Sequence, residues 1–221
     1  MFTHTSPKQL PKIESKTFPD GKRYYTTPSG MVLPSVTTVI GEKKKQFIAE
    51  WRKRVGEEEA NRISRAASGR GTRMHGLVEK YLLNETINWP DEMPDGVYMF
   101  RKIARELKNI NNIHYMEEAL WSEKLGLAGR VDCIAEWKGK LSVIDFKTSQ
   151  KHKTKEQITD YFAQCTAYAL MYEELVGSPI ENIVVLMAVD EGVNLIFEEK
   201  VENHIQSLAE YIDFYRKSKT S

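Results

Sequence analysis

The stretch GRVDCIAEWKGKLSVIDFKTS, residues 129 to 149, constrains the fold more than any other part of the chain. Apolar and polar residues alternate on both sides of Lys138-Gly139, which predicts two antiparallel β-strands joined by a tight turn. Counting back from that turn pairs Trp137 with Lys140 and, further along, Asp132 with Asp145. Two carboxylates would then face each other with Cβ atoms roughly 5 Å apart.

Two like charges at this separation repel by about 3 kcal/mol at an effective dielectric near 20. A divalent cation would remove the repulsion, and Mg²⁺ suits the site because it takes few protein oxygens and keeps water and phosphate as its other ligands. Lys147 would lie on the same face, about 7 Å from Asp145. It could stabilise charge on a phosphate or deprotonate a water, or it could only neutralise the carboxylates as an exposed salt bridge.

The charge of the chain is unevenly distributed. Its 221 residues carry a formal net charge of +1, and 41% of them are apolar, which is enough for one domain with a packed core. From Lys43 to Arg73, however, ten basic residues stand against four acidic ones. This segment is either a solvated helical face or a surface that follows a phosphate backbone, and composition does not separate the two.

Cysteine content and hydropathy exclude several classes of protein. The two cysteines, Cys133 and Cys165, are too few for a four-cysteine iron–sulfur cluster or zinc site and are expected to be small buried residues. The longest apolar run, residues 183 to 189, is too short to span a bilayer, and the N-terminus does not resemble a signal or transit peptide. We therefore expect a soluble intracellular protein with no membrane partner, in a bacterial or phage-infected cytoplasm, with the mitochondrial matrix left open.

The upstream part of the chain is expected to be mainly helical. Short strands should flank the Pro-Ser-Gly turn at residues 28 to 30, and helices should follow with interruptions near Gly41, Gly56 and Gly69. Thr72 would cap the next helix.

Downstream of residue 115 the expected order is β-β-β-α-β-β-α. We predict an α/β (α+β) fold with a mixed β-sheet flanked by helices and a helical N-terminal half. Residues 1–20 would form a flexible arm, and residues 21–221 one domain, in which 21–114 is mainly helical and 115–221 forms the sheet core.

Two further segments carry polar residues that could serve the hairpin. With Thr72 as N-cap, His75 would lie in the first helical turn, where the helix dipole favours a neutral imidazole able to bind a metal or a phosphate. Gln164 and Tyr168 stand one helical turn apart, beside an apolar stripe, and could hold a phosphate or a water. The alternatives are an ordinary residue at a helix start and a plain helix flank.

The order G-T-x-x-H, G-R-x-D, D-x-K, Q-x-x-x-Y resembles the motif order of the PD-(D/E)XK nuclease superfamily, in the branch that includes the RecB nuclease domain. The motifs read GTRMH, GRVD, IDFKTS and QCTAY. The upstream LPSVTTVIG and FIAEWRKRVG are similar to the mitochondrial genome-maintenance exonucleases and their phage and bacterial relatives. The resemblance covers roughly residues 25 to 175. Val131 takes the place of the family's nominal proline.

This resemblance implies a restriction-endonuclease-like core and metal-dependent hydrolysis of phosphodiester bonds, with Mg²⁺ as the ion, Mn²⁺ as a substitute, and no iron–sulfur cluster. The implied metal ligands are His75, Asp132, Asp145 and the backbone carbonyl of Phe146. The implied catalytic residues are Asp132, Asp145, Lys147, Gln164 and Tyr168.

By the same resemblance the basic helices would form an arch or groove for single-stranded DNA. The candidate DNA contacts are Ser35, Lys43, Lys44, Lys45, Trp51, Arg70, Arg73, Arg130 and Thr148. We expect a Mg²⁺-dependent DNA exonuclease that prefers single strands or free ends in DNA replication, recombination or repair, with other replication or recombination proteins as further candidate partners. The alternatives are a structure-selective, resolvase-like endonuclease on the same fold and a non-catalytic module that only binds DNA.

Overall fold

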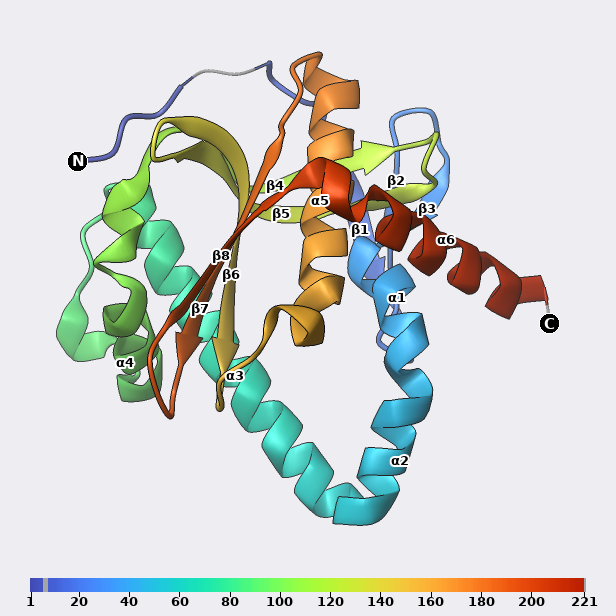
Figure 1. Ribbon diagram of the computed structural model, residues 1–221, viewed down its shortest axis with the longest axis horizontal. Helices are drawn as coiled ribbons and strands as arrows, with labels where there is room; N and C mark the ends of the chain where they lie inside the picture. The colour runs from blue at the N-terminus through green and yellow to red at the C-terminus, as the bar shows by residue number, and fades with distance from the viewer. Residues whose placement is uncertain (6–7, 221) are drawn as a thin grey trace.

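The computed structural model describes residues 1–5 and 8–220, and its N-terminal part combines a small sheet with helices (Figure 1). The antiparallel sheet contains β1 (Glu14–Thr17), β2 (Arg23–Thr26) and β3 (Val32–Pro34). The helices are α1 (Val36–Gly41), α2 (Lys45–Val55), α3 (Glu57–Leu82) and α4 (Pro94–Ile103), with 3-10 turns at Glu42–Lys44, Trp89–Asp91 and Glu106–Asn109. The strands expected around the Pro-Ser-Gly turn are confirmed.

A five-stranded sheet forms the centre of the molecule. It contains β4 (Ile110–Ser122), β5 (Leu127–Trp137), β6 (Lys140–Ser149), β7 (Asn182–Val189) and β8 (Leu195–Lys200), in that order. Helix α5 (Thr159–Val176) connects β6 to β7, and α6 (Ile205–Thr220) follows β8, with 3-10 turns at Lys155–Ile158 and Val201–His204. Because α5 carries the chain back across the sheet, β6 and β7 are parallel, while the other neighbours are antiparallel. The predicted α/β fold with a mixed sheet is confirmed.

Helices cover both faces of this sheet, as Figure 1 shows. On one face, α3 and α4 contribute to a core that includes Ile144 and Phe146 of β6. On the other face, α5 and α6 contribute to a second core that includes Val143. Successive residues of β6 therefore serve opposite cores, as the period of two in a strand requires. By the same alternation Asp145 belongs to the face covered by α5.

The β5–β6 hairpin has the register predicted from its sequence. Its ladder runs from Trp137–Lys140 to Cys133–Ile144, each pair matching the count from the turn. Lys138 and Gly139 have φ of 49° and 78°, the left-handed conformation that a two-residue hairpin turn requires at both central positions. Local turn geometry thus fixes which residues of the two strands face each other.

Helices α2 and α3 form a V that projects from the body of the molecule (Figure 1). The chain breaks between them at Gly56, as predicted, with φ of 87°. The break predicted near Gly69 is wrong, because α3 continues without interruption to Leu82. Thr72 therefore caps no helix, and His75 lies in the interior of α3. Burial of the C-terminal half of α3 against the sheet outweighs the helix propensity that glycine lacks, about 1 kcal/mol per residue.

The N-terminal segment lies along the outer edge of β4. The Thr5 amide donates to the Ile113 carbonyl at 2.9 Å, and the Ile113 amide donates to the Thr3 carbonyl at 2.8 Å. The proposed division into an arm and a single domain stays a prediction.

Cys133 and Cys165 are buried and make no disulfide with each other, as expected for small core residues. Within residues 1–5 and 8–220, no helix is both long enough and apolar enough to cross a bilayer.

Candidate active site

A pocket of about 460 Å³ lies where α3 and α5 approach β4 and β5. Six residues singled out in the sequence line it: Ser35, His75, Arg130, Asp132, Gln164 and Tyr168. The rest of its wall consists of Arg23, Tyr25, Thr37, Gly71, Thr72, Gly76, Glu79, Glu117 and Gly129. The fold thus gathers residues separated by more than 100 positions in the sequence around one cavity.

Strand β4 brings an additional carboxylate to this pocket. Strands β4 and β5 pair through Met116–Cys133 on one side of Glu117 and Glu118–Val131 on the other, in one register. This register places Glu117 opposite Asp132, so their side chains lie on the same side of the sheet. Glu117 has φ of 48°, which is rare for a residue with a side chain.

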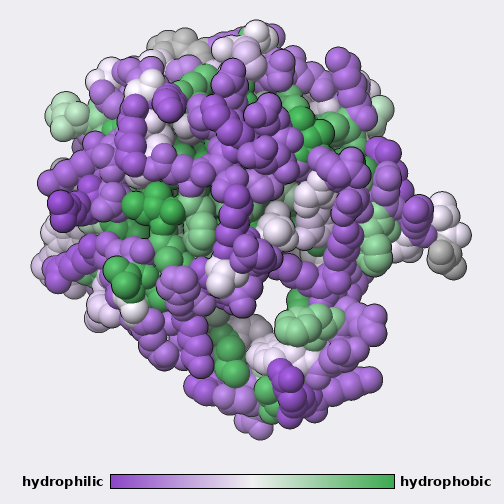
Figure 2. Space-filling view, in the orientation of Figure 1, coloured by the Kyte–Doolittle hydropathy of each residue, from purple (hydrophilic) through white to green (hydrophobic). Residues whose placement is uncertain are grey.

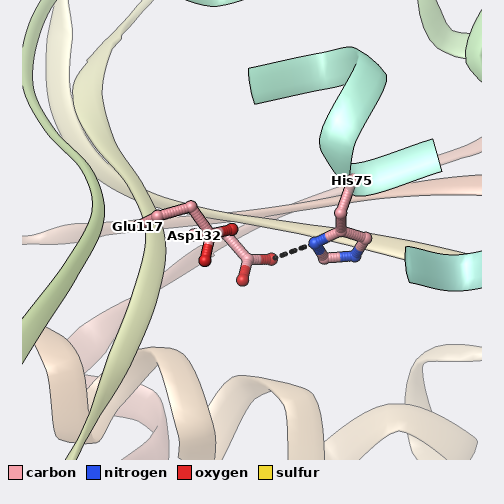
Figure 3. Close-up of side chains that lie close together, drawn as sticks. All are labelled: His75, Glu117 and Asp132. Atoms are coloured by element: carbon pink, nitrogen blue, oxygen red, sulfur yellow. Dashed lines mark ion pairs between the residues drawn. The ribbon is translucent and has the colours of Figure 1, made fainter. Parts of the chain in front are cut away.

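His75, Glu117 and Asp132 form a compact group of metal-ligating side chains (Figure 3). One ligand atom from each lies within 4.8 Å of the others, and His75 Nδ1 is 3.6 Å from Asp132 Oδ2. His75 comes from α3, whereas the two carboxylates come from adjacent strands. Because three separate elements supply these groups, their proximity is a product of the tertiary fold.

The Asp132 carboxylate also joins the two strands of the hairpin. Its Oδ2 accepts a hydrogen bond of 3.0 Å from the backbone amide of Phe146, and both residues lie beyond Cys133–Ile144, the last pair of the β5–β6 ladder. This contact fixes the orientation of the carboxylate. It also holds Asp132 close to Phe146, the residue after Asp145, and so joins β5 to β6 beyond the end of their ladder.

Asp145 and Lys147 form a largely buried ion pair, and neither residue is among those that line the pocket or form the group of His75, Glu117 and Asp132. The Asp145 side chain is 3% exposed and that of Lys147 20%. Burial raises the pKa of Asp145 to about 6, with the Lys147 charge opposing the rise and the Asp132 charge adding to it. Burial works against the charge of Lys147, but Asp145 and Asp132 outweigh it and raise the pKa of the ammonium. Lys147 is therefore a cation at neutral pH.

Glu117 also has an ion-pair partner, Arg130, but this partner is exposed, unlike the largely buried Lys147. Arg130 Nε lies 3.3 Å from Glu117 Oε2, and the Arg130 side chain is 54% exposed. Burial raises the pKa of Glu117 to about 7, and the negative charge of Asp132 adds to this effect, while Arg130 opposes it. The pocket therefore holds two carboxylates close together with one guanidinium at its mouth.

Tyr168 closes the pocket on the α5 side. The residue is 3% exposed, and burial raises the pKa of its phenol well above the usual value, so the hydroxyl keeps its proton. A Cβ at Gly129 would lie 2.9 Å from Tyr168 Oη, closer than side-chain contacts allow. Gly129 is thus required for the phenol to reach the pocket beside Gln164.

Several residues named as DNA contacts already have protein partners. Lys44 pairs with Asp160 at 2.5 Å, Lys45 with Glu42 at 2.6 Å, Arg70 with Asp190 at 3.0 Å, Lys43 with Glu210 at 3.9 Å, and Arg73 with Asp95. Ser35 is buried and caps α1 by accepting a hydrogen bond from the Thr38 amide at 3.0 Å. Trp51 and Thr148 are half-buried. Of this group, Ser35 and Arg130 reach the pocket, and the role of the group in DNA binding stays a prediction.

Glu117 is the site residue that sequence analysis does not single out. The hairpin formed by β4 and β5 contains a signal that could have found it. Counting outward from a turn centred between Lys124 and Leu125 places Glu117 opposite Asp132. The left-handed backbone of Glu117 has no comparable signal in a stretch with no glycine at this position.

The donors of the site fit a hard divalent cation. Carboxylate oxygens with a single imidazole nitrogen suit Mg²⁺ or Mn²⁺, and such ions relieve the repulsion between carboxylates that a fold brings together. Asp132 and Glu117, within 4.8 Å of each other, meet this condition. The neutral phenol of Tyr168 and the amide of Gln164 add donors for an anionic ligand.

Comparisons with known proteins agree with this chemistry. The sequence profile of the PD-(D/E)XK nuclease superfamily matches residues 37–213. Mitochondrial genome maintenance exonuclease 1 of Homo sapiens is 31% identical over 173 residues, which cover 73% of this chain and 50% of the human protein. The Mus musculus protein of the same name is 31% identical over 130 residues, covering 55% of this chain and 38% of that protein. This chain thus spans about half the length of its human relative.

A solved structure of a Eubacterium rectale protein superposes on this chain with a TM-score of 0.46 and 13% sequence identity. The superposition covers 66% of this chain and 63% of that one, a similarity too weak to assign a function. The family profile is decisive, because it covers most of the chain, including all four motifs and the pocket residues between His75 and Tyr168. The five-stranded mixed sheet with flanking helices is consistent with the restriction-endonuclease-like core expected from the motifs. This chain belongs to the PD-(D/E)XK nuclease superfamily.

Proposed function

We propose that the protein is a Mg²⁺-dependent DNA exonuclease that prefers single strands or free ends and works in DNA replication, recombination or repair. The observation that carries the proposal is the pocket in which His75, Glu117 and Asp132 gather beside the Asp145–Lys147 ion pair. Membership of a nuclease superfamily supports phosphodiester hydrolysis. The name of the human relative supports exonuclease rather than endonuclease action.

Four groups of this chain would hold the metal: His75, Asp132, Asp145 and the carbonyl of Phe146. When bound, Mg²⁺ supplies a Lewis acid that polarises the phosphodiester and lowers the pKa of a coordinated water. Asp132 is already oriented for this task by the Phe146 amide. Glu117 lies close enough to His75 and Asp132 to join the same group of ligands.

The other residues of the site would act on the phosphate. Lys147 carries a positive charge beside Asp145, so it would stabilise negative charge on the scissile phosphate rather than take up a proton. Gln164 would donate its amide hydrogens to a phosphate oxygen. Tyr168 keeps its phenolic proton and would donate a hydrogen bond from the floor of the pocket.

The V formed by α2 and α3 supports a preference for single strands. Phe47, Ile48 and Ile63 are exposed by 68%, 44% and 38%, respectively, on helices that also carry many basic residues. Figure 2 shows hydrophobic side chains on the V beside a hollow between it and the body of the molecule. Unpaired bases can stack on an aromatic ring such as that of Phe47 and pack against aliphatic side chains while cations follow the backbone, whereas the bases of a duplex are already stacked on each other.

The test is digestion of linear single strands labelled at the 5′ or 3′ end, compared with duplexes and with a circular single strand. We expect Mg²⁺-dependent release of nucleotides from linear single strands, loss of activity with EDTA, and an intact circle. The Asp145→Asn variant is the control for contaminating nucleases. Cutting of the circle would instead identify an endonuclease, and DNA binding without hydrolysis in any divalent metal would identify a binding module.

A further inference from the structure

The Glu117–Arg130 pair of the pocket and the Asp145–Lys147 pair differ in how easily they can separate. The Asp145–Lys147 pair is buried, with side-chain exposures of 3% and 20%. Breaking it would leave an uncompensated charge away from water, which is costly. The Glu117–Arg130 pair has exposures of 24% and 54%, and the atoms involved lie 3.3 Å apart. Exposed pairs contribute little to stability, so Arg130 can leave Glu117 at small cost.

The balance of charge shows what could replace Arg130. Asp132 and Glu117, when both are ionised, carry two negative charges at the pocket, and Arg130 supplies one positive charge. A divalent cation bound by the two carboxylates neutralises them completely and leaves Arg130 without a counter-ion. Arg23 and Glu79, which also line the pocket, carry opposite formal charges that cancel. The pocket then has one net positive charge, which one phosphodiester group of a nucleic acid strand would neutralise.

The position of Arg130 allows it to serve both groups. It stands two residues before Asp132 on β5, so both side chains project from the same face of the strand. It also lines the pocket together with Gln164 and Tyr168, the groups suited to a phosphate. A guanidinium binds carboxylates and phosphates with the same planar arrangement of donors, so a change of partner needs no change of chemistry.

We propose that Arg130 is an exchangeable counter-ion: it pairs with Glu117 until a divalent cation binds there, and then it binds the phosphodiester of the substrate strand. Glu117 is accordingly a metal ligand in addition to the four groups named above. This inference rests on the proposed nuclease function. It makes the phosphate-binding site complete only after the metal has bound, which favours an order of metal first and DNA second.

Titration with MnCl₂ by isothermal calorimetry, at about pH 8 and constant ionic strength, tests the first half of the exchange. Arg130→Ala should bind Mn²⁺ about two- to fivefold more tightly than the wild type, because the ion no longer displaces a guanidinium. Arg216→Ala is the matched control, since it removes the same charge from α6, where Arg216 donates to the Leu125 carbonyl at 3.1 Å. Adding Glu117→Gln to Arg130→Ala should abolish the gain. Unchanged or weaker Mn²⁺ binding by Arg130→Ala would overturn the proposal.

Binding of a fluorescent single strand with phosphorothioate linkages, which slow hydrolysis, tests the second half. In Mg²⁺, Arg130→Ala should lose about tenfold in affinity, the loss expected for a charge-assisted contact to a phosphate. In EDTA the loss should be much smaller, because Arg130 then keeps Glu117 as its partner and the charges of Glu117 and Asp132 repel a phosphate. Equal losses in both buffers would show a permanent DNA contact and refute the exchange. If the wild type fails to hydrolyse DNA, the proposed function fails, but the Mn²⁺ titration still decides whether Arg130 and the metal compete.

Discussion

Replacing Asp145 by asparagine should change how folding stability depends on pH. Burial raises the pKa of this carboxyl from 3.8 to about 6, although Lys147 opposes the rise. Between these two values the folded protein binds more protons at Asp145 than the unfolded chain does. The free energy of unfolding must therefore fall as the pH rises through this window. Above the folded-state pKa, the contribution of Asp145 to that free energy is fully lost.

The size of the effect follows from the shift. A difference of about two pH units at 1.36 kcal/mol per unit amounts to on the order of 3 kcal/mol. Asparagine cannot ionise, so the variant lacks this contribution. We would measure urea unfolding by circular dichroism in EDTA at several values between about pH 4 and pH 7. Relative to Asp145→Asn, the wild type should lose on the order of 3 kcal/mol across that range.

Comparing the two proteins cancels the contributions of other groups, among them His114, whose pKa burial lowers. A difference that stays constant with pH, or one that favours the wild type at higher pH, would refute the assignment of a buried, ionised carboxylate at this position. Adding Mg²⁺ near pH 7 should stabilise the wild type, by about 2.7 kcal/mol at a hundredfold excess over Kd, and should have little effect on Asp145→Asn.

Three further substitutions test other parts of the site. Gly129→Ala places a Cβ 2.9 Å from Tyr168 Oη, and it should lower the free energy of unfolding by about 1–3 kcal/mol and reduce cleavage, measured by denaturation and nuclease assays. Lys147→Ala removes the cation expected to face the scissile phosphate and should reduce the rate of cleavage at least about a hundredfold, with single-strand affinity changed much less in a filter-binding assay. Trp51→Ala should weaken single-strand binding about tenfold in fluorescence anisotropy, while affinity for a blunt duplex should not change.

The part of the fold that sequence analysis predicts well depends on local geometry. The register of β5 and β6 follows from a turn at Lys138-Gly139, because residues close to a tight turn can pair in only one way. The order of strands and helices after residue 115 likewise follows from the period of the apolar pattern. The observed ladder ends one pair before Asp132 and Asp145, and Asp132 reaches β6 through the Phe146 amide, while its metal-ligating neighbours are His75 and Glu117.

Features that depend on contacts between residues far apart in the sequence are not predicted by local patterns. Gly69 predicts a helix break, yet α3 passes through it and through Gly71 because its C-terminal half packs on the sheet, and a Cβ at Gly71 would already lie 3.6 Å from Thr148 Oγ1. The argument from the helix dipole for a neutral His75 fails with that helix end. Glu117 has a left-handed backbone conformation that its own residue type disfavours and that no local pattern predicts.

The edges of the central sheet are protected in two different ways. On β4, the backbone of Ile113 already forms hydrogen bonds with the N-terminal segment, so this part of the sheet edge is paired. On β8 alternate residues are exposed, and the strand ends in the charged run Glu198-Glu199-Lys200. Open strand borders are templates for aggregation, and charge is a common deterrent. Removing the first five residues should therefore uncover the less charged border and promote self-association, even though those residues lie outside the pocket.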